Sequence, residues 1–454
     1  METLNNIVLT IQNYMSNYVL IIALLGAGLW FSFRLGFIQV RGFGEGMRRT
    51  FGGLFSKKGE AGADGMSSFQ ALATAIAAQV GTGNIAGAAT ALAIGGPGAI
   101  FWMWIAAFLG MATIYAEAIM AQKYKTVGAD GQVTGGPVYY IRAAFKGTFG
   151  KVLAGIFAIL ITLALGFMGN AVQSNSIAAS FHTAFGIPQW IMGLVVAVIA
   201  IFVFMGGMKR IAKVTETIVP FMAALYIIGS LIVIIYNYKN IPYAFASIFI
   251  GAFSPSSVVG GAAGATVKLA LTKGVARGLF SNEAGMGSTP HAHAVAKVNH
   301  PVEQGFVAMA GVFIDTFIVL NLTALVILTT KSIPTGKTGA ELSQYAFSTL
   351  YGKGGNIFIA ICMFFFAFST IIGWYFFGQA NVKYLFGPKA VKIYSVLAAV
   401  CVFLGSLAEV DLVWNMADCF NSLMVIPNIL ALFALSKVIS QVHKDYFKNF
   451  NKAK

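Results

Sequence analysis

The stretch Ser67–Ala93, SSFQALATAIAAQVGTGNIAGAATALA, is long and apolar enough to cross a lipid bilayer as a helix. Its middle, QVGTGN at 79–84, is unusual for a membrane helix, because two glycines weaken helix propensity and three polar side chains lie at mid-depth. A backbone group that loses its helical partner in hydrocarbon is costly unless another group bonds it. The stretch therefore predicts a helix interrupted to hold an anionic group and a cation, with close packing of small residues against a neighbouring helix as the alternative.

The composition is that of a helical protein with many membrane spans. Of 454 residues, 58% are hydrophobic and only 10% are charged, and the mean hydropathy is +0.78. The three cysteines lie in apolar spans without metal-ligand spacing, so we interpret them as small buried hydrophobic residues. The N-terminus lacks the basic region of a cleavable signal peptide.

Eleven hydrophobic spans follow one another along the chain, near residues 16–38, 67–93, 98–122, 150–182, 188–207, 215–237, 264–294, 304–330, 355–382, 391–408 and 416–436. The loops after odd-numbered spans hold 23 Lys and Arg residues, whereas the loops after even-numbered spans hold four. By the positive-inside rule, the N-terminus is expected outside and the C-terminus in the cytoplasm, in a protein of the cell membrane. The net charge of +15 follows from this topology, so no nucleic-acid binding is expected.

A second interrupted stretch, TKGVARGLFSNEAGMGSTPH at 272–291, lies five spans after the first. Four glycines punctuate it, a proline lies near its end, and Ser281-Asn282-Glu283 place polar groups in its middle. Paired interruptions in two halves of a chain indicate a transporter site. The spacing predicts two five-span repeats of opposite orientation after one extra helix. A long extracellular amphipathic loop is the alternative for the outer part of this stretch.

The predicted organisation has four parts. Residues 1–66 hold the extra transmembrane helix and a cytoplasmic amphipathic segment, 67–237 the first five-helix repeat, 238–436 the second repeat, and 437–454 a basic cytoplasmic tail. The basic segment Arg41–Glu60 is expected to lie along the lipid surface, or else to be a flexible loop. No linker or shift in composition marks a second soluble domain.

Three motifs carry a family resemblance: GTGNIAG at 81–87, GGPGAIFWMWIAAFLGMATIYAE at 95–117 and RGLFSNEAGMGS at 277–288. Over nearly the whole chain the sequence resembles the sodium:alanine (alanine or glycine:cation) symporter family, within the amino acid–polyamine–organocation superfamily. The resemblance implies an all-α polytopic membrane protein with the leucine-transporter-type 5+5 inverted repeat, one extra N-terminal helix and 11 transmembrane helices. It also implies sodium-coupled uptake of alanine, with glycine as a second candidate substrate.

The resemblance places a small zwitterionic substrate at the first interruption. The amides of Thr82 and Gly83 would bind its carboxylate, assisted by the N-terminal end of the outer half-helix. Gln79 and Asn84 would line the same break. Alternatively, Thr82 and Asn84 serve only to satisfy the broken backbone.

Other spans would complete the substrate site. Phe167 would contact the methyl group, and Asn170, about one turn later on the same face, would bond the substrate or a neighbouring helix. Trp374 would cap the pocket or serve only in packing. Unwound carbonyls and a hydroxyl for the ammonium group would come from Phe280, Ser281 and Asn282, unless the second break lies nearer Gly274.

A sodium site is implied between the first interrupted span and the span at 355–382. In the latter, Ser369-Thr370 is the only adjacent pair of hydroxyl residues. The carbonyls of Ala77 and Val80 would face these hydroxyls, and Phe366 is a candidate for a fifth oxygen; such ligands suit a hard cation. Bonding of both hydroxyls to the preceding helical turn is the alternative.

Acidic residues within the hydrophobic spans bear on whether transport is coupled to sodium or to protons. Glu117 is expected in an ion pair or an interfacial role, whereas Glu283 and Asp315 lie deeper and keep a proton-coupled amino acid symporter as the second hypothesis. His291 and His293 are interpreted as gate or loop residues. No nucleophile–base set or metal cluster indicates an enzyme, two isolated breaks argue against a channel, and no appended domain supports a sensor.

Overall fold

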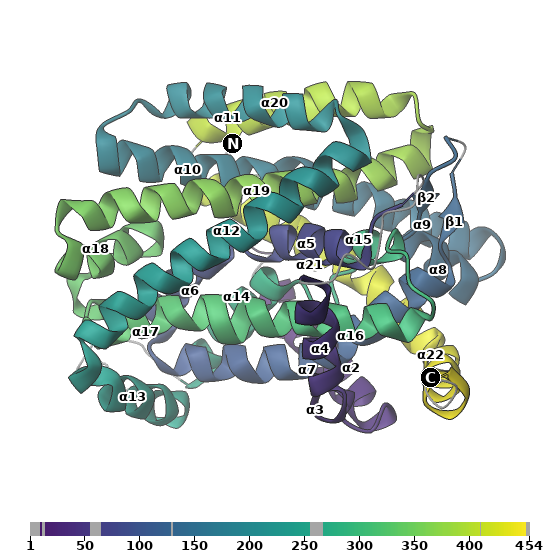
Figure 1. Ribbon diagram of the computed structural model, residues 1–454, viewed down its shortest axis with the longest axis horizontal. Coiled ribbons are helices and arrows are strands. Elements are labelled where there is room, and N and C mark those ends of the chain that lie inside the picture. The colour runs from purple at the N-terminus through teal and green to yellow at the C-terminus, as the bar shows by residue number, and fades with distance from the viewer. Residues whose placement is uncertain are drawn as a thin grey trace.

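The computed structural model describes residues 10, 14–54, 65–128, 130–254, 267–408 and 410–450. Of the segments discussed above, residues 1–9, Lys57 and Lys58, the start of the seventh span at 264–266, and the last four residues of the tail lie outside these ranges. Within them the chain is almost entirely helical, and its long helices run side by side (Figure 1).

The helices of the first half are η1 (Met15–Val19), α2 (Leu20–Arg34), α3 (Ile38–Arg41), α4 (Phe43–Leu54), α5 (Ser68–Gln79), η2 (Gly83–Gly87), α6 (Ala88–Gly95), α7 (Gly98–Lys123), α8 (Pro137–Ala144), α9 (Gly147–Ile161), η3 (Thr162–Gly169), α10 (Asn170–Phe185), α11 (Gln189–Phe204), α12 (Gly207–Tyr236), η4 (Tyr238–Asn240) and α13 (Ile241–Phe253). A short antiparallel hairpin, β1 (Thr126–Val127) and β2 (Val133–Thr134), precedes α8 and pairs Thr126 with Thr134.

The helices of the second half are α14 (Val267–Asn282), α15 (Pro290–Ala294), α16 (Pro301–Val312), η6 (Phe313–Leu320), α17 (Asn321–Thr329), η7 (Ile333–Thr335), α18 (Gly339–Tyr351), α19 (Lys353–Phe386), α20 (Ala390–Leu407), α21 (Val410–Ala434), α22 (Ser436–Asp445) and η8 (Tyr446–Phe450).

Seven helical stretches among the described residues are long and apolar enough to cross a membrane: Gly98–Lys123, Gly147–Phe185, Gly207–Tyr236, Pro301–Thr329, Lys353–Phe386, Ala390–Leu407 and Trp414–Ala434. Three shorter apolar helices cover Leu20–Arg34, Gly83–Gly95 and Gln189–Phe204. Each of the eleven predicted ranges contains a helix or an interrupted pair of helices. The chain also forms α13 and α18, which lie between the predicted spans.

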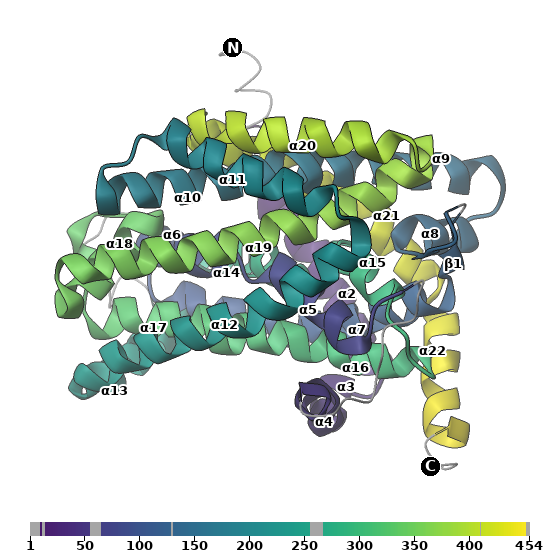
Figure 2. The same ribbon diagram turned by 45° about the horizontal axis from the view of Figure 1, so that its top comes forward.

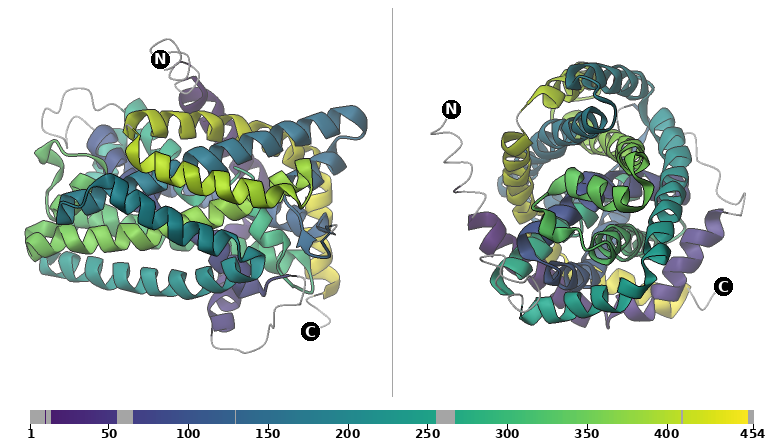
Figure 3. Two further views of the ribbon diagram at one scale, coloured as in Figure 1. Left: turned by 90° about the horizontal axis from the view of Figure 1, so that it is seen from above. Right: turned by 90° about the vertical axis from the view of Figure 1, so that its left-hand side faces the viewer.

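The connecting segments separate to the two ends of the bundle. The hairpin, α8 and α22, which follow odd-numbered spans, lie at one end of the long helices in Figure 1, and α13 and α18, which follow even-numbered spans, lie at the other. Seen along their length, the helices gather into one bundle (Figure 3). The uneven distribution of basic residues therefore corresponds to two physical ends of the molecule.

Two interrupted helices lie inside this bundle. The first, α5, packs against α12, α19 and α16, and the second, α14, packs against α7 and α6. The sequence starts α5 sharply, because the Ser67 hydroxyl accepts from the Gln70 amide while the Gln70 side chain accepts from the Ser67 amide, both at 3.1 Å. The first part of the second stretch lies within α14, a helix packed against α7 and α6, and is not a loop.

The amphipathic segment after α2 forms α3 and α4, which lie outside the long helices in Figure 2. On α4, Arg49 pairs with Glu303 of α16 at 3.0 Å and with Glu45 at 2.6 Å, and it donates to the Tyr446 hydroxyl at 3.0 Å. These bonds join α4 to α16 and to the C-terminal helices, so residues 43–54 are a docked helix.

We expect Arg49→Gln to loosen this docking, because it removes the guanidinium shared by three partners. Amide hydrogen exchange over residues 43–54 should become about tenfold faster, the factor that corresponds to about 1.4 kcal/mol. Arg48→Gln is the control, because Arg48 pairs only at a surface where its side chain is 74% exposed. Equal exchange in the two variants would contradict the docking role of Arg49.

Candidate functional site

The first helix is interrupted where the sequence predicts it. After Gln79 the backbone leaves the helix at Val80, and helical structure resumes at Gly83. Two side chains bond the amides that the interruption frees: Asn84 Oδ1 accepts from Gly81 N at 2.9 Å, and Gln173 Oε1 accepts from Thr82 N at 3.2 Å. The amide of Gly83 lies in the first helical turn after the break, where N–H groups have no partner within the helix.

The second interruption lies between α14 and α15, after Asn282. Glu283, Gly285 and Gly287 have φ of 57°, 86° and 80°, a left-handed conformation that ends a helix and that glycine adopts without strain. Phe280, Ser281 and Asn282 therefore occupy the last helical turn, and not an unwound segment as the sequence analysis expected. Gly274 lies within α14, so the break is not there.

One carboxylate joins the two interruptions. Asp315 Oδ1, from the π-helical segment η6, accepts from Asn84 Nδ2 at 2.7 Å and from Ser281 Oγ at 2.9 Å, and Oδ2 accepts from Thr316 Oγ1 at 2.9 Å. Asp315 is 0% exposed. Within the described part of the chain no basic side chain pairs with it, so neutral donors alone hold this acid.

A second link runs directly between the interrupted helices. Gln79 Nε2 donates to the carbonyl of Asn282 at 2.7 Å, and Asn282 Nδ2 donates to Thr316 Oγ1 at 3.3 Å. Gly83 lies so close to Ser281 that a Cβ on Gly83 would stand 3.3 Å from the Ser281 Cα. The predicted residues of the two breaks thus form one buried polar cluster.

Several polar atoms of this region have no hydrogen-bond partner among the described residues. They are Gln79 Oε1, Thr82 Oγ1, Asn170 Oδ1 and Ser174 Oγ, all buried. Asn170 and Ser174 lie on the same face of α10 as Gln173, which bonds Thr82 across the first break. Buried polar groups without partners are rare in folded proteins, and a water, an ion or a polar ligand is what satisfies such groups.

Five oxygens meet between α5 and α19. Thr370 Oγ1 lies 2.8 Å from the Ala77 carbonyl and 3.5 Å from that of Val80, and Ser369 Oγ lies 3.4 Å from Ala77 O. Both hydroxyls also donate to the carbonyl of Phe366, at 2.9 and 3.0 Å. The two hydroxyls therefore lie beside the carbonyls of α5, as expected of a cation site. They also bond the preceding turn of α19, as in the alternative.

Gly81 permits this approach of the two helices. A Cβ at this position would stand 2.4 Å from Thr370 Oγ1 and 3.1 Å from Gln173 Oε1. A larger residue would separate the carbonyls of α5 from the hydroxyls of α19. Gly81 of the motif GTGNIAG is thus required for the close packing of α5 against α19.

Of the three aromatic residues expected at the substrate site, Trp374 and Phe280 contact each other beside Glu283, whereas Phe167 packs elsewhere. Trp374 donates from Nε1 to Glu283 Oε1 and contacts Phe280 edge-to-face, with 5.9 Å between ring centroids. Phe167 is placed differently from the expectation, because its ring packs against Tyr394 of α20 at 5.5 Å. No hydrogen bond or ring contact between described residues joins Phe167 to either interruption.

The expected role of Glu117 is wrong. Instead of an ion pair or an interfacial position, its buried carboxylate accepts from the amides of Gly285 and Gly287, both at 2.9 Å, and from Asn428 Nδ2 at 2.6 Å. Glu117 thus bonds the backbone that the second interruption frees. The sequence shows only an acid within an apolar span. It does not show the partners of Glu117, because they lie 168 or more positions away along the chain.

The two histidines lie on α15, beyond the second break. His291 bonds the Ser288 carbonyl through Nδ1 at 2.7 Å and Asn381 through Nε2 at 2.8 Å, and His293 bonds Gln304 at 2.8 Å. The described residues contain no group of three or more His, Cys, Asp or Glu side chains that could hold a metal ion.

A bundle of apolar helices, two of them interrupted and joined at buried polar groups, is the architecture of a secondary transporter. The chain matches the sodium:alanine symporter family over residues 1–454, and it belongs to that family. It is an integral membrane transporter and not an enzyme.

Individual relatives carry different substrate names. The chain is 41% identical to the sodium/alanine symporter AgcS of Methanococcus maripaludis, over 98% of this chain and 99% of the relative. It is also 41% identical to the probable sodium/glutamine symporter GlnT of Bacillus subtilis, over 98% and 91%. Among solved structures, a manganese transporter of Eremococcus coleocola matches with a TM-score of 0.53 and 14% identity, over 86% of this chain and 82% of that one, which shows a shared fold alone.

We expect Glu117→Gln to destabilise the second interruption. The amide replaces one of two accepting oxygens with a donor that faces a backbone N–H, and a buried unpaired group costs about 1–3 kcal/mol. Hydrogen exchange at residues 283–289 should accelerate, and thermal unfolding in detergent should shift to lower temperature. Glu216→Gln is the control, because this partly buried acid on α12 bonds Gln70, far from the second interruption. Unchanged exchange at 283–289 in Glu117→Gln would overturn this role.

Proposed function

We propose that the protein is a sodium-coupled symporter that carries a small neutral amino acid into the cell, with alanine as the first candidate and glycine as the second. The observation that carries the proposal is the set of five oxygens from Ala77, Val80, Phe366, Ser369 and Thr370 beside the first interruption. Carbonyl and hydroxyl oxygens without a charged ligand suit a monovalent hard cation better than a divalent one.

The substrate site is proposed next to this ion site. The carboxylate of the amino acid would bind the amides of Thr82 and Gly83, displacing the Gln173 side chain that now accepts from Thr82. Thr82 Oγ1, Gln79 Oε1 and Asn170 Oδ1, which lack partners among the described residues, would bond its polar groups. Ser281 and Asn282 lie at the opposite break, on the side assigned to the ammonium group.

The size of the substrate is argued from the aromatic residues. Phe280 and Trp374 meet edge-to-face beside the cluster, where they limit the space for a side chain. The two relatives named for alanine and for glutamine are equally similar to this chain, so identity does not select between them. The aromatic contact favours alanine and glycine, and Phe167, which faces α20, would contribute only after a rearrangement.

The proposed mechanism is alternating access. Sodium would bridge α5 and α19, and the substrate would bridge the two interruptions, so that both must bind before the core rearranges as a unit. We assign the chain to the amino acid–polyamine–organocation superfamily, with the 5+5 inverted repeat after one extra helix, 11 transmembrane helices, the N-terminus outside and the C-terminus in the cytoplasm. The separation of basic and non-basic connections to opposite ends of the bundle supports this topology.

In proteoliposomes, an inward sodium gradient should drive uptake of labelled alanine, and a matched potassium gradient should not. The double variant Ser369→Ala, Thr370→Ala should lose at least about tenfold of sodium-driven uptake, because two of five ligands are removed. Ser395→Ala is the control, since that buried hydroxyl lies on α20 and bonds Tyr375 and Val391. Uptake driven equally by potassium, or unaffected in the double variant, would refute the ion site.

A proton-coupled symporter of the same fold is the second candidate, because Asp315 and Glu283 are buried acids at the two breaks. If sodium alone drives transport, Asp315→Asn should change the affinity for alanine while transport stays sodium-dependent, since the carboxylate then only links Asn84 and Ser281. Uptake in a proton gradient without sodium, abolished in Asp315→Asn and in Glu283→Gln, would establish the second candidate instead.

A further inference from the structure

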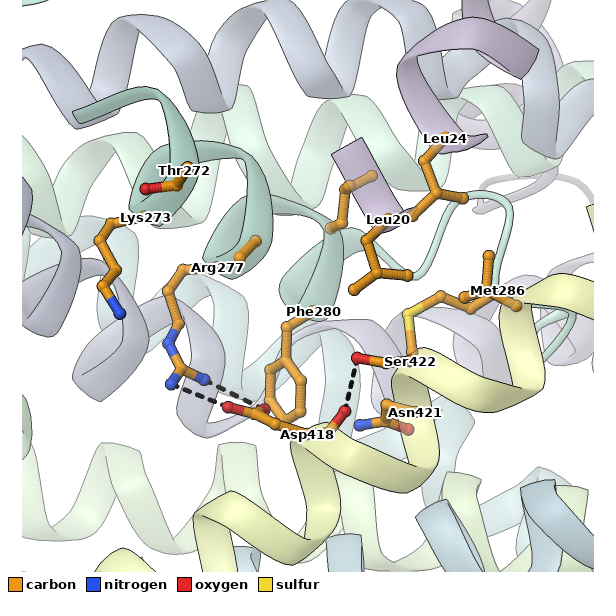
Figure 4. Close-up of a pocket in the computed structure, with 13 residues that line it drawn as sticks. Leu20, Leu24, Thr272, Lys273, Arg277, Phe280, Met286, Asp418, Asn421 and Ser422 are labelled. Atoms are coloured by element: carbon orange, nitrogen blue, oxygen red, sulfur yellow. Dashed lines mark hydrogen bonds and ion pairs between the residues drawn. The ribbon is translucent and has the colours of Figure 1, made fainter. Parts of the chain in front are cut away.

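A cavity of about 60 Å³ lies between α2, α14 and α21, several times the volume that one water molecule requires. Figure 4 shows the charged and polar side chains that line it. Lys273 and Arg277 come from one face of α14, and Asp418, Asn421 and Ser422 come from the facing side of α21. Leu20 and Leu24 of α2 supply an apolar wall.

An ion pair forms one side of the cavity. Both terminal nitrogens of Arg277 bond the carboxylate of Asp418, at 3.3 and 3.0 Å, and the guanidinium lies 4.9 Å from the ring centre of Trp414. This pair neutralises one positive and one negative charge. The cavity therefore keeps one excess positive charge, which Lys273 carries.

Two polar side chains at the cavity lack a hydrogen-bond partner among the described residues. Lys273 makes no hydrogen bond or ion pair there, although it lies one helical turn from Arg277. Asn421 is 5% exposed, yet neither its Nδ2 nor its Oδ1 has a hydrogen-bond partner. A buried carboxamide with both ends unpaired is costly, and it is satisfied by a ligand that presents both an acceptor and a donor.

The cavity extends along α14 toward the second interruption. Its lining runs from Thr272 and Lys273 to Phe280 and Met286. Phe280 faces this cavity and also contacts Trp374, beside the buried polar cluster. A molecule in the cavity is thus separated from the proposed central site by these two aromatic side chains.

We propose that this cavity is a second, outer binding site for a zwitterionic amino acid on its way to the central site. The carboxylate binds Lys273 Nζ and Asn421 Nδ2, and the ammonium group binds Asn421 Oδ1 beside Asp418. The α2 wall covers the small side chain. The assignment of the amino acid as the ligand rests on the proposed function, whereas the preference for an anionic group is argued from Lys273 and from the unpaired amide of Asn421.

A small zwitterion fits these groups better than an inorganic anion. An anion such as chloride satisfies Lys273 and Asn421 Nδ2, but it leaves Asn421 Oδ1 unpaired because it has no proton to donate. A bare cation would face the excess positive charge. Water alone would satisfy Asn421 without requiring Lys273, which the experiment distinguishes.

The test uses the full-length protein, with alanine binding measured on purified protein and sodium-driven uptake measured in proteoliposomes. Lys273→Met and Asn421→Leu should each raise the KM for alanine about tenfold, the size expected for one charge-assisted hydrogen bond, with Vmax within about twofold of the wild type. Lys268→Met is the matched control, because Lys268 lies on the same helix, bonds Tyr18 and does not line the cavity. Gel filtration and thermal unfolding establish that each variant is folded, and Lys273→Gln replaces any variant that is not.

An unchanged KM in both cavity variants overturns the proposal, as does a lower Vmax at constant KM. If the KM for alanine depends on chloride in the wild type but not in Lys273→Met, the ligand of the cavity is an inorganic anion. That result overturns the proposal as well. Alaninol, which lacks the carboxylate, should bind Lys273→Met as well as it binds the wild type, and a loss of alaninol binding equal to that of alanine contradicts the role of Lys273. Failure of the proposed function gives a different result. Uptake would then not depend on sodium, but Lys273→Met and Asn421→Leu would still weaken the binding of alanine to purified protein.

Discussion

Two helices are interrupted inside an apolar bundle, and every backbone N–H that this frees requires a hydrogen bond that water cannot supply there. Side chains from other helices provide several of these bonds. Gln173 accepts from Thr82, and Glu117 accepts from Gly285 and Gly287, while Asn84 closes the first break from within its own segment. The hydrogen bonds that α7 and α10 supply through Glu117 and Gln173 are therefore a condition for the interruptions to exist at all.

Asp315 makes the two interruptions a single unit. Its carboxylate binds Asn84 on one side and Ser281 on the other, so a movement of either half-helix changes the surroundings of the other. The carbonyl of Ala77, in the last turn of α5, and that of Val80, where the helix ends, both meet α19. A cation between α5 and α19 would thereby sense the conformation of both breaks, which is the physical requirement for coupling two transported species.

The sequence predicted the class and the places of interruption more fully than the details of the site. The glycines and polar residues of QVGTGN locate the first break correctly, because local propensity and the cost of polar groups in lipid act on the same residues. The second break was placed about a turn too early, since the left-handed conformation of a non-glycine residue, Glu283, ends α14. The contact of Phe167 with Tyr394 could not be predicted, because helical spacing does not tell which neighbour an aromatic ring meets.

The sequence by itself determined a membrane protein of many helices, its family, and two interrupted segments, because hydropathy, loop charge and glycine content are properties of short stretches. Only the tertiary structure decided which groups satisfy those segments. The partners of Thr82, Gly285 and Asp315 lie tens to hundreds of residues away along the chain. The two faces of the cavity are also far apart in the sequence, and there the Asn421 amide has no hydrogen-bond partner among the described residues. Such contacts depend on how helices pack against one another, and that packing is set by the whole chain at once.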